Sequence, residues 1–489
     1  MKNLKEKIKN CISSNLDKNM DYIKELFKDN SDMVYREFEF PCFKAALVYI
    51  DGMSNKEVLD DYVLESLMQE ERELKDFKEI KDKLITVSEI KEIDNLSEGI
   101  KDVLCGETLL LINGFNLACI IGTRSWPARG ISEPSGETTI RGSREGFSET
   151  IRFNTALVRR RIRDTRLRIK STVVGVRSKT DLAIMYIDDI VNKRVLRELE
   201  RRIDRIDIDA ILDSGYIEQL IEDDCLSPFP QIQSSERPDV VAAALYEGRI
   251  AILVDNSPFA IIVPATLPSL LQSPDDYYQR WISASIVRIL RTIAIIMAIT
   301  FPALYISVTS FHTAIIPTRL AYSIAASREG VPFPAFIEAL IMEISFDLLL
   351  EAIVRLPRPI GATIGIVGGL IIGQSAVSAG IVSPIMIIIV SITAITEFIT
   401  PNYGVTTGLR IVRVFLTICS AIVGLYGIML GLIVVLTHLI KLKSFGIPYL
   451  APVVNSNKRD LKDLFVRLPL KFFKKRPIFI KTKDKTRQE

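Results

Sequence analysis

The most constraining feature of this sequence is the contrast between a charged first part and a long apolar region. Charged residues occur throughout roughly the first 280 positions, whereas Ile, Val, Leu, Ala and Gly dominate from about Trp281 to Ile440. From Lys441 onward the chain is again rich in Lys and Arg. This contrast predicts a polar domain followed by an all-α polytopic membrane domain and a basic tail.

A helix that crosses a bilayer needs about 20 apolar residues, because the hydrocarbon core is about 30 Å thick and each residue adds about 1.5 Å. Buried helices of a soluble core are the alternative, but four long apolar runs favour membrane crossing. These four runs lie at about 289–311, 360–379, 381–399 and 411–440. A fifth window, 335–354, is apolar but carries several carboxylates, and it is predicted to form an acidic amphipathic helix.

The carboxylates of that fifth window follow a regular pattern. Glu343, Asp347 and Glu351 are four residues apart, so they share one helical face. Carboxylates that face lipid at mid-depth are costly. This face must therefore lie at the membrane interface, border a wet cavity where it attracts cations, or pack against basic residues such as Arg410 and Arg413.

The flanking charges predict the orientation. Arg288 and Arg291 stand at the start of the first window, and Lys441 and Lys443 follow the last one. Both ends are thus expected on the cytoplasmic side, which requires an even number of crossings, such as four spans with a non-crossing acidic helix. The first residues are charged and lack the apolar core of a secretory signal, so the polar domain is expected to be cytoplasmic.

Glycine recurs in the window 360–379. Gly361, Gly365, Gly369 and Gly373 have the four-residue spacing that allows close approach of membrane helices. A second line of residues lies on another face of the same helix. Two interpretations stay open: the glycines only pack helices together, or the second line borders a narrow ion path. The members of this second line are Thr363, Val367, Leu370, Gln374 and Ser378.

The polar part contains a repeat. ALVYIDGMSNKEVLDDYVLESL, from Ala46, aligns with LAIMYIDDIVNKRVLRELERRI, from Leu182. In the same order, ETLLLINGFNLACIIGT, from Glu107, resembles GRIAILVDNSPFAIIVPAT, from Gly248, and both read as β-hairpins. The turns of these hairpins are expected at Asn113-Gly114 and Asp255-Asn256. The repeat predicts two related α/β subdomains, at about 37–123 and 172–265.

No residue pattern points to an enzyme or a cofactor. Asp51 and Asp188 end strands and are expected to cap the following helices rather than to act in catalysis. The segment SGETT lacks the lysine of a phosphate-binding loop. The two histidines, His312 and His438, lie far apart at the ends of apolar windows, so they predict structural roles and no metal site.

The segment GISEPSGETTIRGSREGF, from Gly130, joins the two subdomains and leads into SETIRFNTALVRRRIRDTRLRIKS, which is predicted to be an arginine-rich helix. Another subunit, lipid headgroups and nucleic acid are the possible partners. A net charge of +3 and few aromatic residues argue against nucleic acid, whereas mixed signs favour pairing between subunits. The residues expected to face a neighbouring subunit or lipid are Glu133, Glu137, Arg141, Arg144, Glu145, Arg152, Arg159, Arg160 and Arg161.

Several of these stretches together resemble the signature of the A subunit of GerA-type spore germinant receptors. They are SEPSGETTIRGSREGFSETIRFNTALVRRRI, PFPAFIEALIMEISFDLLLEA, IGIVGGLIIGQSAVSAGIVSP and SFGIPYLAP, in that order along the chain. The resemblance covers nearly the whole sequence, apart from the first residues and the charged tail.

The resemblance implies a subunit of a nutrient-sensing complex in the inner membrane of the spore. It further implies a homo-oligomer, of the pentameric kind, that forms a ligand-gated channel for monovalent cations beside a transporter-like B subunit and a lipoprotein C subunit. It favours the interpretation in which the second line borders a pore. A non-conducting scaffold for the B and C subunits is the first rival. A secondary transporter is the second, but it should show inverted repeats in its membrane part.

The sequence therefore predicts an α/β cytoplasmic part of two related subdomains, followed by an all-α polytopic membrane domain. In chain order, the expected parts are subdomain 1 (1–126), an Arg/Glu-rich linker (127–170), subdomain 2 (171–280), the membrane domain (281–440) and a basic cytoplasmic tail (441–489).

Overall fold

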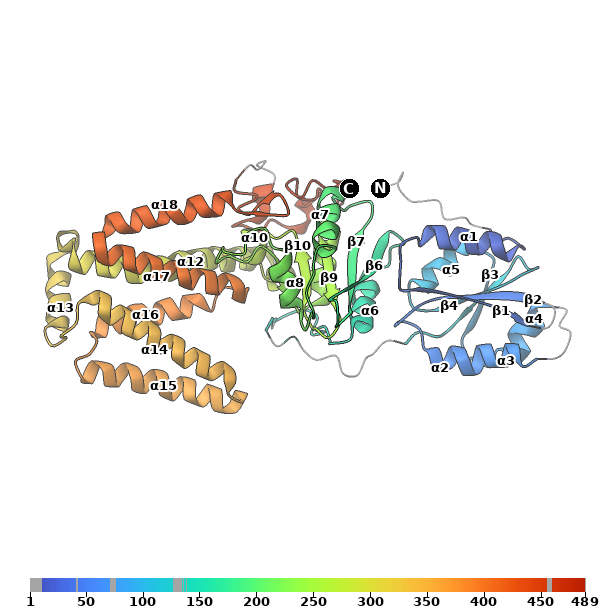
Figure 1. Ribbon diagram of the computed structural model, residues 1–489, viewed down its shortest axis with the longest axis horizontal. Helices are drawn as coiled ribbons and strands as arrows, with labels where there is room; N and C mark the ends of the chain where they lie inside the picture. Colours follow the sequence, from blue (N-terminus) through green and yellow to red (C-terminus); the bar gives the residue numbers. More distant parts are fainter. Residues whose placement is uncertain are drawn as a thin grey trace.

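Three parts follow one another along the molecule in the computed structural model of this chain. Figure 1 shows subdomain 1 at one end, subdomain 2 in the middle and a bundle of long helices at the other end. The structure describes residues 11–488 apart from 41–42, 71–75, 126–133, 135, 138 and 455–459. The expected α/β part and the all-α part are both present.

Subdomain 1 is a five-stranded sheet with helices on both faces (Figure 1). Its strand order is β1-β2-β4-β5-β3, and all of its strand pairs are antiparallel. Its strands are β1 (Met33–Phe40), β2 (Phe43–Ile50), β3 (Ile90–Ile93), β4 (Thr108–Ile112) and β5 (Ala118–Ile121). Its helices are α1 (Leu16–Leu26), α2 (Lys56–Leu59), α3 (Glu65–Met68), α4 (Phe77–Glu79) and α5 (Leu96–Val103).

Subdomain 2 repeats this topology, with the strand order β6-β7-β9-β10-β8. Its strands are β6 (Leu167–Val174), β7 (Thr180–Ile187), β8 (Gln233–Ser235), β9 (Ile250–Val254) and β10 (Ala260–Val263). Its helices are α6 (Ile151–Arg161), α7 (Lys193–Ile203), α8 (Ser214–Ile221) and α9 (Pro238–Tyr246).

The two sheets confirm that the polar part is a repeat. Strands β2 and β7 have equal length, and the aligned residues Tyr49 and Tyr186 both stand next to the last position of their strand. Both expected hairpins form, as β4-β5 and β9-β10. Their turns need a left-handed residue, which Gly114 supplies with φ 96° and Asn256 with φ 65°.

The helix caps differ from the prediction. Asn55 and Asn192, not Asp51 and Asp188, cap helices α2 and α7, because their Oδ1 atoms accept hydrogen bonds from the first backbone N–H groups of these helices. The two aspartates end their strands too early to reach those groups. Each forms an ion pair instead, and Asp51 Oδ1 lies 2.9 Å from Lys56 Nζ.

The arginine-rich helix is also shorter than predicted. Helix α6 ends at Arg161, and strand β6 begins at Leu167, so Arg168 lies on a strand. Between them the Asp164 carboxylate accepts hydrogen bonds from the backbone N–H and the guanidinium of Arg166, which stabilises a turn.

The helical part comprises seven helices within the described residues. Helix α12 packs along α17 and α16, and α14 packs against α15 (Figure 1). The acidic helix α14 also contacts α12, α16 and α17, so it belongs to the bundle. The bounds are α12 (Trp281–Ser310), α13 (Thr318–Arg328), α14 (Ala335–Arg355), α15 (Arg358–Ser378), α16 (Pro384–Glu397), α17 (Tyr403–Val423) and α18 (Leu425–Lys441).

The window 411–440 was predicted to be one span, and this is wrong. The chain turns back at Gly424, whose φ of +67° lies in the left-handed region, so that α17 and α18 form an antiparallel pair. A Cβ on Gly427 would lie 2.0 Å from the Cys419 carbonyl oxygen, and one on Gly431 would lie 2.6 Å from Leu416. Glycine at these positions therefore permits the close packing of the two helices.

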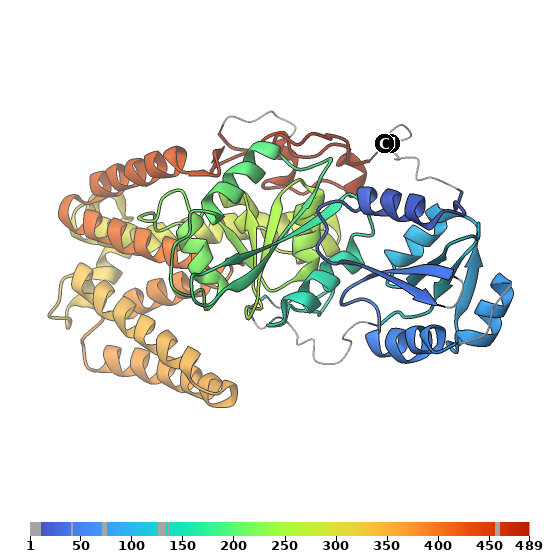
Figure 2. The ribbon, with the colours of Figure 1, turned by 45° about the vertical axis from the view of Figure 1, so that its right-hand side comes forward.

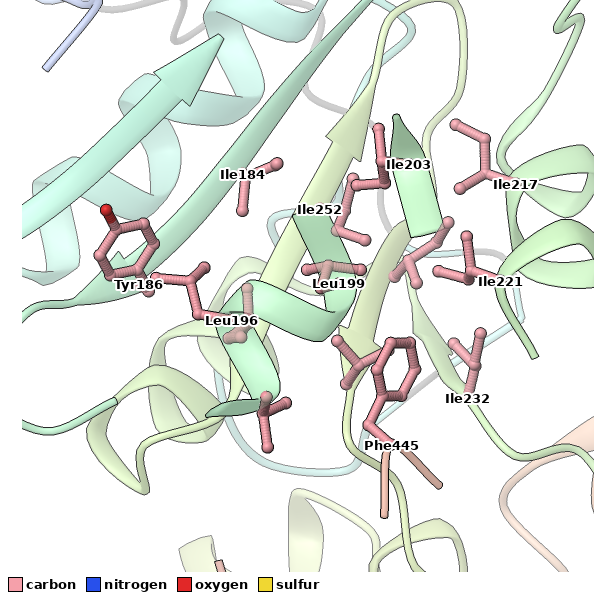
Figure 3. Close-up of a cluster of buried hydrophobic side chains, with 14 of the residues drawn as sticks. Ile184, Tyr186, Leu196, Leu199, Ile203, Ile217, Ile221, Ile232, Ile252 and Phe445 are labelled. Carbon is pink, nitrogen blue, oxygen red and sulfur yellow. The ribbon is translucent and has the colours of Figure 1, made fainter. Parts of the chain in front are cut away.

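The basic tail is not a separate extension. After α18 the chain forms a small ribbon, β11 (Lys443–Ser444) with β12 (Ile447–Pro448), that packs on subdomain 2 (Figure 2). Phe445 is buried among apolar side chains of α7, α8 and the sheet, including Leu199 and Ile221 (Figure 3). Ser444 donates a hydrogen bond of 2.7 Å to the Gln231 carbonyl oxygen. Subdomain 2 thus holds both ends of the helical part.

Replacing Phe445 with alanine should destabilise subdomain 2, because it leaves a cavity in the core and removes the ring over which the Arg202 guanidinium lies at 4.4 Å. We expect a loss of about 3–5 kcal/mol of unfolding free energy, measured by thermal unfolding of the full chain in detergent. Phe472→Ala is the matched control, because Phe472 lies in the same C-terminal segment but is 61% exposed. Equal unfolding midpoints for the two variants would contradict the packing described here.

Candidate functional site between the apolar helices

The helical part exposes many large apolar side chains. Large side chains are exposed on every long helix, for example Ile296 (55%) on α12, Ile422 (70%) on α17 and Ile433 (57%) on α18. Surfaces of this kind mark contact with lipid or with another protein. By length and composition, α12 and α17 qualify as membrane-crossing helices within the described part of the chain, and α16 and α18 are shorter apolar helices.

A cluster of five charged side chains lies between helices α14, α16 and α17. Arg413 Nε lies 3.1 Å from Glu343 Oε1, and Arg413 Nη1 lies 3.3 Å from Glu397 Oε2. Arg410 Nε lies 3.1 Å from Glu397 Oε1 and 3.4 Å from Asp347 Oδ1. The side chains of Arg413, Glu343 and Glu397 are at most 5% exposed. We call these five residues the charge cluster.

Local sequence places the members of the cluster. Glu343 and Asp347 are one helical turn apart on α14, and Arg410 and Arg413 are one turn apart on α17, so the two pairs meet where the helices contact each other. Glu397 is the last residue of α16. The sequence predicted contact between the first four residues, as one of three alternatives, but it missed Glu397 because a single acid at a helix end has no periodic signal.

The charge cluster is incompletely hydrogen-bonded within the chain. Only the contact between Arg410 Nε and Glu397 Oε1 has hydrogen-bond geometry, and both carboxylate oxygens of Glu343 lack a hydrogen-bond partner. Three carboxylates face two guanidinium groups, so the fully ionised cluster carries one excess negative charge. Such a group stabilises water or a cation placed beside it.

The third acid of the predicted face, Glu351, is outside the charge cluster. It pairs with Arg355 one turn further along α14, at 2.5 Å, and both side chains are more than half exposed. A different acid of α14, Glu338, is fully buried and pairs with Arg328 at 3.0 Å. Its Oε2 also accepts a 2.9 Å hydrogen bond from the backbone N–H of Ser383, which precedes α16.

The predicted glycine stripe packs only partly. Cβ atoms on Gly361 and Gly365 would each lie 3.2 Å from Ile353 of α14, which shows that α15 and α14 are in close contact there. Gly373 lies near Ile387, whereas Gly369 has no atom within 4 Å of its Cβ position. A glycine outside the stripe, Gly368, makes the closest approach, at 2.9 Å from Leu349.

The second line of α15 is exposed where the structure describes it. Thr363, Gln374 and Ser378 are all exposed to the surroundings. The side chains of Val367 and Leu370 lie outside the described residues. The exposed polar side chains stand near the two ends of α15, and the positions between them are apolar in the sequence.

The linker residues make contacts inside the chain, which differs from the predicted pairing between subunits. The fully buried Arg159 donates two hydrogen bonds to Asp32, of 2.9 and 2.8 Å, and so ties α6 to subdomain 1. Arg152 pairs with Asp51. Arg160 and Arg161 both pair with Glu145.

The remaining linker residues are less uniform. Glu137 accepts a 2.6 Å hydrogen bond from Ser235. Arg141 and Arg144 are exposed, so contact with another subunit or lipid stays a prediction for them. Glu133 lies outside the described residues.

The arginines at the start of the first window are buried and paired. Arg288 and Arg291 are 3% and 6% exposed, and both contact Asp276 at 3.0 Å. Arg288 Nη1 also lies 2.7 Å from Asp463, which belongs to the C-terminal segment. Arg288 therefore joins the start of α12 to the C-terminal segment, and Arg291 joins it to Asp276 and the Leu271 carbonyl oxygen. The cytoplasmic orientation inferred from these charges stays a prediction.

The fold combines a duplicated α/β domain with a bundle of apolar helices, and the second half of the α/β domain holds both ends of this bundle. This combination defines a class of membrane-associated protein. A profile of the family described as Bacillus/Clostridium GerA spore germination protein matches residues 21–479. The chain therefore belongs to the GerA family of spore germination proteins, as the sequence motifs indicated.

Individual relatives agree with this family. The chain is 44% identical over 487 residues to spore germination protein B1 of Bacillus subtilis (strain 168), covering 98% of this chain and 99% of the relative. It is 42% identical over 479 residues to the uncharacterized membrane protein YfkQ of the same strain, covering 98% and 93%. The crystal structure of the N-terminal domain of the A subunit of the Bacillus megaterium spore germinant receptor GerK3 is 36% identical, with a TM-score of 0.43, and covers 53% of this chain and 98% of that one.

Removing Arg413 should destabilise the helical bundle, because it leaves Glu343 buried without its counterion and leaves Glu397 with Arg410 alone. For Arg413→Gln we expect a loss of about 3–5 kcal/mol, measured by thermal unfolding of the full chain in detergent, and partial recovery when Glu343→Gln is added. Arg355→Gln is the matched control, since its exposed pair should be worth about 0–1 kcal/mol. A midpoint for Arg413→Gln equal to that of the control would refute the structural role of the cluster.

Proposed function

We propose that this chain is the A subunit of a nutrient-responsive germinant receptor, and that several copies form a ligand-gated channel for monovalent cations in the inner membrane of the spore. The pentameric assembly implied by the family resemblance is part of this proposal. The transporter-like B subunit and the lipoprotein C subunit are its proposed partners, together with membrane lipid. Subdomains 1 and 2 are placed on the cytoplasmic side.

The exposed second line of α15 is the observation that carries the channel proposal. In a single chain, Thr363, Gln374 and Ser378 are exposed on a helix that packs mainly against α14. Polar side chains of a membrane helix avoid lipid and face protein or water. Copies arranged around an axis would place these polar side chains against water or a neighbouring copy. The path would then have polar residues at its two ends and an apolar constriction between them, as in gates that close by dewetting.

The charge cluster supports cation rather than anion conduction. Its excess negative charge and the hydrogen-bonding capacity left on Glu343 favour a cation or a water molecule nearby. Asp347 is the most exposed carboxylate of the cluster, with 34% of its side-chain surface exposed. It is therefore the carboxylate best placed to attract cations.

The attachment of the bundle supports an even number of crossings. Helix α12 begins and α18 ends on subdomain 2, so both ends of the bundle are on one side of a membrane that the bundle spans. Since α15 packs against α14, and α14 contacts α12, α16 and α17, we place both of them across the membrane, with α12, α16, α17 and α18. This gives an even number without the non-crossing helix that the sequence suggested.

A non-conducting scaffold for the B and C subunits is the second candidate. The packing of Gly361 and Gly365 against Ile353 within the same chain favours it, because these glycines then need no channel to explain them. The two candidates differ in whether the chain by itself can make a membrane leak.

Shortening the apolar side chains between Thr363 and Gln374 should open a constriction, if α15 lines a pore. We expect growing cells that express Val367→Ala and Leu370→Ala together to lose potassium faster than cells expressing the wild type, measured with a potassium electrode. The matched control is Ile388→Ala with Ile395→Ala on α16, where both side chains are more than half exposed. Oligomers shown intact by crosslinking, without any leak above this control, would favour the scaffold.

Neutralising Asp347 should change ion selectivity if the charge cluster attracts cations to the path, because Asp347 is a partly exposed carboxylate of that cluster. For Asp347→Asn in the leaky background, we expect a smaller ratio of potassium to chloride permeability, measured from reversal potentials in planar bilayers. Glu351→Gln removes an equal charge at an exposed pair on the same helix and is the control. An unchanged permeability ratio, or equal changes in both variants, would exclude a role for the cluster in selectivity.

A further inference from the structure

A cavity of about 620 Å³ lies at the junction of subdomain 2, the linker and the helical bundle. Its walls come from α9, from the connection between β10 and α12, from the turn between α16 and α17, and from the C-terminal segment. Cavities that bind small molecules have volumes of about 300–1,000 Å³ and a few convergent polar groups. The volume and the mixed lining of this cavity are of that kind.

Arg249 gives the cavity a buried positive group with spare hydrogen-bonding capacity. The residue is 6% exposed and lines the cavity. Its Nε donates a 2.8 Å hydrogen bond to the Pro264 carbonyl oxygen, and its Nη1 donates one of 2.8 Å to Gln233 Oε1. Its Nη2 has no partner. A guanidinium held rigidly by two bonds, with its third nitrogen free, is preorganised for an incoming acceptor.

A second unpartnered group comes from the bundle side of the same cavity. Thr400, which is 8% exposed, lies in the turn between α16 and α17, and its Oγ1 atom has no hydrogen-bond partner. A hydroxyl can donate to an anionic oxygen. Two residues that line the cavity, from two different parts of the fold, therefore each hold a buried donor without a hydrogen-bond partner.

Among the described residues, no acid around the cavity forms a direct ion pair with Arg249, although Glu247 acts on it electrostatically. Asp239 is 2.8 Å from Arg237 and accepts a hydrogen bond from Tyr278. Glu247 lies 3.7 Å from Arg487, and burial raises the pKa of its carboxyl. Burial likewise raises the pKa of Glu137 to about 7 and lowers the pKa of Arg249 to about 10. Each of these pKa shifts reflects incomplete compensation of a buried charge. A bound anion would raise the pKa of Arg249 again.

We propose that this cavity binds a small anionic molecule through a carboxylate or phosphate group held by Arg249 and Thr400. The rest of the molecule would lie against the apolar part of the lining, which includes Val240, Ala243 and Leu270. Carboxylate and phosphate are the groups that a guanidinium recognises best. Soluble metabolites and anionic lipid headgroups both carry such a group. Either source is possible here, because the cavity lies where subdomain 2 meets the bundle.

An occupant of this cavity would contact the turn that leads out of the charge cluster. Thr400 is three residues after Glu397, which pairs with Arg410 and Arg413. Binding at Thr400 therefore biases the position of the end of α16 relative to α17. The binding proposal does not depend on conduction, because it concerns an equilibrium that can be measured on the isolated chain.

The test is a binding measurement on the full-length chain in phosphatidylcholine nanodiscs. Inorganic phosphate and succinate are titrated at constant ionic strength against chloride, and the shift of the thermal unfolding midpoint gives the affinity. We expect saturable stabilisation by at least one probe, weakened about tenfold or more in Arg249→Gln by loss of the charge-assisted bond. Arg177→Gln is the control, because it removes an 81% exposed arginine from the same subdomain.

Two further variants keep the test decisive if Arg249→Gln fails to fold. Ala243→Phe fills the cavity from an exposed position of α9, and Thr400→Val removes only the unused hydroxyl. We expect Ala243→Phe to abolish the stabilisation and Thr400→Val to reduce it. Titration in phosphatidylglycerol nanodiscs separates the two sources: loss of the phosphate effect there, restored in phosphatidylcholine, identifies the lipid headgroup as the occupant. No saturable effect in either lipid, or an effect that survives Ala243→Phe, would overturn the proposal.

Discussion

The need to neutralise buried guanidinium groups organises this protein more than any other constraint. An ion taken out of water costs several kcal/mol unless a counterion meets it in good geometry. Arg159 of subdomain 2 forms an ion pair with Asp32 of subdomain 1. At the start of α12, Arg288 forms ion pairs with Asp276 and with Asp463 of the C-terminal segment. The contacts with Asp32 and Asp463 join parts of the chain that are distant in sequence.

The buried arginines differ in how completely they are hydrogen-bonded. Arg159 donates hydrogen bonds from all three of its guanidinium nitrogens, so it has little capacity for another ligand, whereas Nη2 of Arg288 has no partner. Arg413 sits among carboxylates whose hydrogen bonds are incomplete, and one nitrogen of Arg249 has no partner. Incomplete satisfaction of a buried charge is costly to stability, so positions that retain it are where binding or conduction is best sought.

Subdomain 2 is the part through which the molecule holds together. It contacts subdomain 1 through α6, and it receives Phe445 from the far end of the bundle into its core (Figure 3). The turn between α16 and α17 also reaches its cavity. Subdomain 2 therefore contacts both subdomain 1 and the helical bundle, so a change in its packing would affect both.

The sequence by itself determined the division into a polar repeat and an apolar bundle, the two hairpins and the family. These follow from periodic or duplicated patterns, which can be recognised in short stretches of the sequence. The helix break at Gly424, the place of Phe445 in a core built mainly from residues 174–263, and the addition of Glu397 to the charge cluster depended on the folded structure. They arise from contacts between segments distant in sequence, where burial and charge compensation select one partner among many that the local pattern allows.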